Sequence, residues 1–332
     1  MLPFINIEEQ AFDNLKKLRD VIANQDRRDY ELPIQRVSLR EDGTLQAGKF
    51  KGPLIRSALC GLLKNLRIPL DFALYRCPQD LLLEIVRRMA KVQDTVLRIN
   101  TIDGVVTGIM PADRQPIRHD ILVDCLGVER PVKEATLGID CLRITAITTK
   151  SRELLPDDTF ACGWELMNRE SGWQSTEMWR WVVREKCSNG IVGLERNPIF
   201  RRPYNSREPT LKALKKLVDS IQEAMSLPEL EPAIRWAADK RIGKEYEFVV
   251  NYLVRKLEGD ATKQALDKVT AETSWYELMN IVTYLAKLHR IDMRRRYEAE
   301  GGILLNWFSI QGRGRPPWRQ VYCEECKVWS TN

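Results

Sequence analysis

Residues 96–110 read VLRINTIDGVVTGIM, which is two strand-like runs joined at Asp103-Gly104. An Asp-Gly pair between two such runs is a strong signal for a tight hairpin turn. A second pair, Asp42-Gly43, lies within the alternating stretch 34–50. Tight turns join antiparallel neighbours, whereas parallel strands need crossover connections. Because helical patterns separate the two hairpins, the sequence predicts an α+β fold in which a curved antiparallel sheet, built from hairpins, is flanked by helices.

Apolar residues at helical spacing predict several helices around these hairpins. The first covers residues 7–23, with Asn6 and Glu9 as a capping pair. Others cover 54–66, the segment after Pro78, and 121–126, and strand-like runs follow at 137–149, 159–167 and 191–194. A further helix is predicted to begin at Ser175 and to end at Ser188-Asn189-Gly190. Its apolar residues at helical spacing are Met178, Trp179, Val182, Val183 and Cys187.

After residue 209 the apolar pattern becomes almost wholly helical, with stripes over 211–225 and 246–257 and a helix from Ser274 that Glu277 would cap. The sequence therefore divides into an α+β core domain at 1–209, an α-helical region at 210–310, and a tail at 311–332. The tail is basic, rich in Gly, Arg and Pro, and contains Cys323 and Cys326 in a Cys-x-x-Cys spacing.

The composition of the 332 residues, with 44% hydrophobic and 30% charged, is that of a globular protein. No stretch approaches the roughly 18 uninterrupted apolar residues of a membrane span, and no export signal is recognisable at the start. Eight scattered cysteines are typical of reduced thiols in a core. We expect a cytoplasmic protein that has no membrane partner.

Enzyme motifs are absent from the sequence. There is no Walker-type phosphate loop, no G-x-G-x-x-G after a strand and no G-x-S-x-G, and the chain has only two histidines. Structural zinc needs four ligands, usually two cysteine pairs, and only one Cys-x-x-Cys pair is present. We therefore expect neither catalysis nor a metal or other cofactor. A metal-dependent nuclease that uses the carboxylates of Asp157, Asp158, Glu165 and Glu170 remains an alternative.

The stretch 162–193 carries the most information in the chain. It contains a turn, Asn168-Arg169-Glu170-Ser171-Gly172, then Arg184 and a Cys187-Ser188-Asn189-Gly190 block. Upstream stand Arg67-Ile68-Pro69 and Tyr75-Arg76-Cys77-Pro78. Over about 54–192 the chain resembles the phage- and plasmid-encoded proteins of domain-of-unknown-function 932. The resemblance implies a mobile-element context, and it implies no mechanism because that family has no established activity.

Positive charge is modest in total, +6 from 52 basic and 46 acidic residues, but it is clustered. Clustered cations next to aromatic residues are typical of proteins that bind single-stranded nucleic acid, in which rings stack on bases and cations hold phosphates. The residues expected to hold the backbone in a basic groove are Arg180, Arg184, Arg196, Arg201, Arg202, Lys212, Lys215 and Lys216. Tyr204 and either Trp179 or Trp181 are expected to stack on bases, because residues two apart on a helix point in different directions.

These features predict a single-stranded nucleic-acid-binding protein, with DNA favoured, that acts in phage or plasmid recombination or replication. A homo-oligomer that anneals strands is the expected form. Two simpler interpretations remain open, that the tryptophans are core packing and that the cations form a solvated face. The alternative function is a non-enzymatic protein-interaction factor that blocks or recruits a host complex through its helical C-terminal region.

Overall fold

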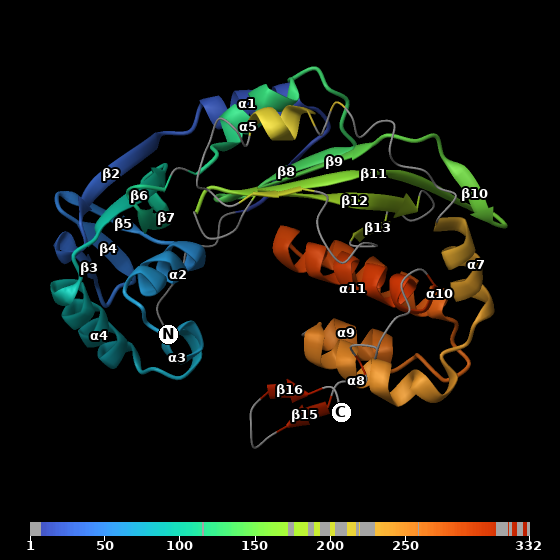
Figure 1. The fold of residues 1–332 in the computed structure, drawn as a ribbon. Coiled ribbons are helices and arrows are strands. Elements are labelled where there is room, and N and C mark those ends of the chain that lie inside the picture. The colour runs from blue at the N-terminus through green and yellow to red at the C-terminus, as the bar shows by residue number, and fades with distance from the viewer. Residues whose placement is uncertain are drawn as a thin grey trace. The chain divides into compact units, whose positions relative to one another are not determined.

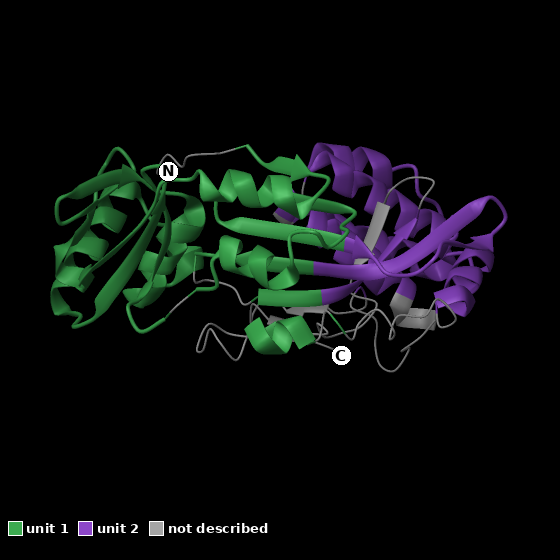
Figure 2. Ribbon diagram, turned by 90° about the horizontal axis from the view of Figure 1, so that it is seen from above, with its two compact units in different colours: residues 1–145, 166–178, 200–219 green, residues 146–165, 179–199, 220–332 purple. Residues whose placement is uncertain are grey.

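The computed structural model describes residues 8–114, 116–171, 176–184, 189–192, 200–202, 211–216, 219, 230–257, 259–309, 318, 321–323 and 328–330. The chain forms two compact units that interleave along the sequence (Figure 2). Unit 1 comprises residues 1–145, 166–178 and 200–219, and unit 2 comprises 146–165, 179–199 and 220–332. The expected domain boundary at residue 209 lies outside the described residues and stays a prediction.

Unit 1 contains two small antiparallel sheets made from the hairpins (Figure 1). One has the strands β3 (Val37–Leu39), β4 (Thr44–Ala47) and β5 (Phe50–Pro53). The other has β2 (Arg27–Pro33), β6 (Val96–Ile102) and β7 (Val105–Pro111), in the order β2-β6-β7. Asp103 and Gly104 have φ angles of 51° and 77°, as a hairpin turn with two left-handed residues requires. Both predicted Asp-Gly hairpins are confirmed.

A larger sheet has the strand order β1-β8-β9-β11-β12-β13, with β10 beside β11 and β14 beside β12. Its strands are β1 (Gln10–Phe12), β8 (Glu134–Leu137), β9 (Cys141–Ile147), β10 (Arg152–Leu155), β11 (Asp158–Arg169), β12 (Thr176–Arg184), β13 (Asn189–Val192) and β14 (Phe200–Arg202). Strands β9, β11 and β12 each contribute residues to both units. Strand β8 pairs antiparallel with both β1 and β9, and the antiparallel sheet expected from the hairpins is confirmed.

The helices of unit 1 are α1 (Leu15–Ala23), α2 (Arg56–Asn65), α3 (Leu70–Tyr75), α4 (Gln79–Val92), α5 (His119–Leu126) and a helix at residues 211–216, with a 3-10 turn η1 (Ile34–Arg36). Helix α2 packs against β7, and a Cβ atom on Gly61 would lie 2.3 Å from the carbonyl oxygen of Ile109. The first helix is shorter than predicted. Asn14, whose side chain accepts from the backbone N–H of Lys17, caps α1, and residues 10–12 form a strand instead.

The helix predicted from Ser175 is wrong, because residues 176–184 form strand β12. Its sequence, TEMWRWVVR, is rich in aromatic and β-branched residues, and spacing alone cannot separate a short apolar run of this kind from a helix. In a strand, residues two apart point to the same side. Trp181 and Val183 pack with Ala161 of β11, and Trp179 lies against the same cluster.

Unit 2 is largely helical, as predicted for the C-terminal region. Besides β10, β13 and its parts of β9, β11 and β12, it contains α7 (Leu230–Asp239), η2 (Gly243–Glu245), α8 (Tyr246–Lys256), α9 (Asp260–Leu266), α10 (Trp275–Leu285), η3 (Ala286–Leu288), α11 (Ile291–Ser309) and a hairpin of β15 (Val321–Cys323) and β16 (Val328–Ser330). The capping pair is confirmed, because Ser274 and Glu277 bond to each other's backbone N–H. Within the described residues, no helix has the length and apolar character that crossing a membrane requires.

Candidate functional site

The face of the β2-β6-β7 sheet that points away from the apolar core carries charged side chains at every second position of β2. On β2, Tyr30 and Leu32 pack against the apolar core, so Arg27, Asp29 and Glu31 point the other way. On β6, Leu97 and Ile99 lie in the same core, and the alternate residues are Arg98, Asn100 and Ile102. The register pairs Arg27 with Ile102, Asp29 with Asn100 and Glu31 with Arg98. Two adjacent strands therefore present one polar surface.

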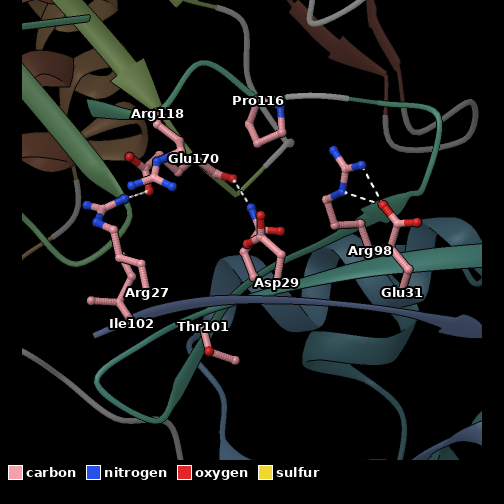
Figure 3. Close-up of a pocket in the computed structure, with 10 residues that line it drawn as sticks. Arg27, Asp29, Glu31, Arg98, Thr101, Ile102, Pro116, Arg118 and Glu170 are labelled. Atoms are coloured by element: carbon pink, nitrogen blue, oxygen red, sulfur yellow. Dashed lines mark hydrogen bonds and ion pairs between the residues drawn. The ribbon is translucent and has the colours of Figure 1, made fainter. Parts of the chain in front are cut away.

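This surface forms one wall of a pocket of about 470 Å³ in unit 1 (Figure 3). Segments distant in the sequence contribute Pro116, Arg118 and Glu170 to it. Three arginines and three carboxylates line the pocket, so its formal charge is zero. The complete lining is Arg27, Asp29, Glu31, Arg98, Asn100, Thr101, Ile102, Pro116, Arg118 and Glu170.

Each arginine of the pocket is already held by an acceptor. Arg98 donates from Nε and Nη2 to Oε1 of Glu31 at 3.1 and 2.5 Å, and from Nη1 to the carbonyl oxygen of Arg114 at 2.9 Å. Arg118 donates from Nε and Nη2 to the two carboxylate oxygens of Asp120 at 3.1 and 2.9 Å. These bonds fix the guanidinium planes and neutralise their charge.

Besides Oδ1 of Asn100, which is buried without a partner among the described residues, three groups of the pocket keep unused hydrogen-bonding capacity within the described part of the chain. The exposed carboxylate of Asp29 has no partner there. Both bonds from Arg98 to Glu31 end on Oε1, which leaves Oε2 available. The bonds of Arg118 to Asp120 use Nε and Nη2, which leaves Nη1 as a donor. The pocket therefore offers carboxylate acceptors beside a guanidinium donor.

Glu170 lies at the back of the pocket and is only 3% exposed. Its carboxylate accepts a hydrogen bond from Nη1 of Arg27 (Figure 3). It accepts another from the backbone N–H of His119, the first residue of α5. A buried carboxylate is costly unless it is paired and hydrogen-bonded, and these two donors meet that need. Its backbone N–H donates to the carbonyl oxygen of Asp140 at 2.9 Å.

His119 is fully buried behind Glu170. Burial lowers the pKa of its imidazole, although the carboxylate of Glu170 acts in the opposite direction. Asn168 accepts from the hydroxyl of Thr176 at 2.7 Å, and its Nδ2 lies 3.0 Å from Nδ1 of His119, as a donor would. Nδ1 is thus an acceptor and the ring is neutral with its proton on Nε2, which has no partner among the described residues.

The predicted nucleic-acid residues of unit 1 include three lysines on the helix at 211–216. Leu214 is buried, whereas Lys212, Lys215 and Lys216 are exposed. Positions i, i+3 and i+4 share one side of a helix, so these side chains form one surface, here called the lysine face. No carboxylate pairs with them among the described residues. The helix is held to α5, because Sγ of Cys125 lies 3.4 Å from the carbonyl oxygen of Leu211.

The structure says less about the other residues after Gly190 that are predicted to contact nucleic acid. Arg201 lies on β14, with 67% of its side chain exposed, and pairs with Glu177 at 3.1 Å. Arg202 is on the same strand, opposite Thr176, and its side chain is outside the described part. Arg196 and Tyr204 also lie outside the described residues. Their predicted contacts with nucleic acid stay predictions.

Arg180, Arg184, Trp179 and Trp181 belong to unit 2, and the structure corrects two of these assignments. Trp181 is only 2% exposed, so its ring is not open to a base. Arg184 binds the buried carboxylate of Asp158 through Nε at 2.6 and 2.7 Å, and its guanidinium lies 5.5 Å from the ring centre of Tyr276. Arg180 is partly buried, and the guanidinium of Arg295 covers the ring of Trp179 at 5.0 Å.

Three of the four carboxylates considered for a metal site are bound to arginines, and the fourth, Asp157, is exposed on the turn before β11. Glu165 accepts from Arg295 at 3.0 Å, as Asp158 does from Arg184 and Glu170 from Arg27. Within the described residues no three His, Cys, Asp or Glu side chains are grouped to hold a metal ion. Cys326 lies outside that part of the chain, so the Cys-x-x-Cys pair stays untested.

Known proteins offer no further guide. No family model, no curated protein and no solved structure matches this chain. The resemblance to the domain-of-unknown-function 932 proteins therefore stays a prediction from the motifs. Two residues of its Asn168-to-Gly172 motif, Asn168 at the end of β11 and Glu170 directly after it, belong to the buried network behind the pocket.

Proposed function

We propose that this protein binds single-stranded nucleic acid and that the lysine face of the helix at 211–216 contacts its phosphates. The observation that carries the proposal is the arrangement of Lys212, Lys215 and Lys216, exposed on one side of a helix that Leu214 anchors. Cations without carboxylate partners displace the counterions condensed on a polyanion, and this release drives association. Arg201, also exposed in unit 1, adds a fourth cation if it leaves Glu177.

Single-stranded DNA is the favoured ligand, and a phage or plasmid role in recombination or replication, carried out by an annealing homo-oligomer, is the proposed context. The support for this context is the motif resemblance over 54–192. The lysine face itself recognises phosphate and not sequence, as expected of a protein that coats or anneals strands.

The test is fluorescence anisotropy with labelled single-stranded and duplex oligonucleotides across a salt series from about 50 to about 200 mM. Each lysine that neutralises one phosphate of a single strand contributes about 0.7 to the slope of log K against log salt. The variant Lys212→Ala/Lys215→Ala/Lys216→Ala should therefore flatten the slope by about 2. The matched control is Arg87→Ala/Arg88→Ala/Lys91→Ala, which removes the same charge from exposed positions of α4, where Arg87 and Arg88 already pair with Glu84.

The control should keep the wild-type slope. Equal losses in both variants would mean that total charge, and not the lysine face, governs binding. Absence of binding to either oligonucleotide at low salt would reject the proposal and favour the protein-interaction alternative.

A further inference from the structure

Helix α5 connects the pocket to the lysine face. Its first residue, His119, donates its backbone N–H to Glu170, and Arg118 directly before it lines the pocket. Near its other end Cys125 contacts Leu211 of the helix that carries the lysines. Eight residues at 1.5 Å each make α5 about 12 Å long. One strand in a helical geometry advances about 3.4 Å per nucleotide, so a few nucleotides span this length.

The charge of the pocket argues against a phosphate as its ligand. Arg27 is bound to Glu170, Arg98 to Glu31 and Arg118 to Asp120. An anion that drew Arg27 to itself would leave Glu170, which is buried, without its counterion. Removing one partner of a buried pair is strongly unfavourable, because it leaves an uncompensated charge in the interior. An uncharged ligand with its own donors and acceptors avoids this cost.

The unused groups define the donor pattern of that ligand. Asp29 and Oε2 of Glu31 accept hydrogen bonds, and Nη1 of Arg118 donates one. Guanine has two adjacent donors on its N1 and N2 atoms, which suit a carboxylate, and acceptors at O6 and N7, which suit a guanidinium. Adenine and cytosine each offer a single amino group to a carboxylate. Ile102 and Pro116 supply apolar surface for the face of a ring.

From these observations we infer that the pocket is a nucleobase site that accepts one unstacked guanine from the strand bound on the lysine face. Asp29 binds the donor edge of the base and Arg118 binds its acceptor edge. The volume of about 470 Å³ lies within the range of pockets for small molecules, about 300–1,000 Å³. The choice of a nucleobase over other neutral polar ligands rests on the proposed nucleic-acid function.

Free nucleosides test the pocket without any contribution from phosphates. The full chain is titrated with guanosine, adenosine, cytidine and uridine in a calorimeter. We expect guanosine to bind at least tenfold more tightly than the other three. Asp29→Asn removes the carboxylate from an exposed position and should weaken guanosine binding at least tenfold. The matched control, Asp113→Asn, changes an exposed carboxylate outside the pocket lining and should bind as the wild type does.

The inference is overturned if guanosine does not bind, if the four nucleosides bind equally, or if Asp29→Asn binds guanosine as tightly as the wild type. The triple lysine variant keeps the two proposals separate. It should lose oligonucleotide binding and retain guanosine binding. Oligonucleotide binding without guanosine binding would reject only the pocket, whereas guanosine binding without oligonucleotide binding would reject only the lysine face.

Discussion

Gly108 of β7 lies against the backbone of Ser171, so closely that a Cβ atom on Gly108 would be 2.9 Å from the Cα atom of Ser171 and 3.1 Å from the carbonyl oxygen of Glu170. Both obstacles are backbone atoms, which cannot rotate away as the end of a side chain can. The absence of a side chain at residue 108 therefore lets the turn that carries Glu170 sit behind the pocket.

Gly108→Ala should displace this turn and lower the free energy of unfolding by about 1–3 kcal/mol, the usual cost of overpacking. Urea unfolding followed by circular dichroism measures the change. Val96→Ala, at an exposed position of β6 in the same sheet, serves as the control and should change stability by less than about 0.5 kcal/mol. If the two variants are equally stable, the turn tolerates movement and Gly108 is not needed for close packing.

Arg184→Ala should destabilise the protein by about 3–5 kcal/mol, because it leaves the buried carboxylate of Asp158 without its cation. Tyr276 still donates to Asp158 in this variant but carries no charge. The measurement is the midpoint of urea unfolding, compared with Lys212→Ala as a surface control. A variant that unfolds like the wild type but loses salt-dependent binding of oligonucleotides would restore the original prediction that Arg184 holds phosphate.

His119 should make the protein less stable in mild acid. Its pKa in the unfolded chain is about 6.5, and burial lowers the folded value. As the pH falls below about 6.5, the unfolded chain takes up a proton that the folded chain does not, so the free energy of unfolding falls by up to about 1.4 kcal/mol per pH unit from this group. Urea unfolding at pH values between 7 and 5 should show a smaller decline for His119→Gln than for the wild type. Parallel declines would assign the acid sensitivity to other groups.

Much of the fold follows from local signals in the sequence. The turns at Asp42-Gly43 and Asp103-Gly104 can be recognised in the sequence, because few other residues accept the backbone angles that these turns require. Helix α10 begins where Ser274 and Glu277 satisfy each other's backbone N–H groups. Such features depend on neighbours within a few residues, so they can be read without knowledge of the rest of the structure.

Strand β12 shows where that reading fails. The spacing of the apolar residues in this segment fits a helix in part and a strand in part. The strand forms because Trp181 and Val183 pack against Ala161 on β11, with Trp179 against the same cluster. The helix prediction also placed the two tryptophans on different sides, whereas a strand places residues 179 and 181 on one side. The sequence around Arg184 does not indicate that its side chain is paired, because its carboxylate partner Asp158 lies 26 residues earlier.

The pocket was not anticipated, although β2 carries a readable signal. Arg27, Asp29 and Glu31 alternate with Tyr30 and Leu32, which is the pattern of a strand with one polar face. A pattern of this kind indicates that a polar surface exists but not what lies opposite it. Glu170, which closes the back of the pocket, is 143 residues from its partner Arg27.

The sequence by itself determined the hairpins, the helical C-terminal region and the three lysines on one side of a helix, because turn chemistry, capping and periodicity act over short distances along the chain. Only the tertiary structure decided which charges are free. Arg184 is bound to Asp158, and Arg27 is bound to Glu170. In contrast, the carboxylate of Asp29 and Nη1 of Arg118 have no hydrogen-bond partner among the described residues. Electrostatic pairing depends on distance in space, and folding brings together groups that are far apart in the chain.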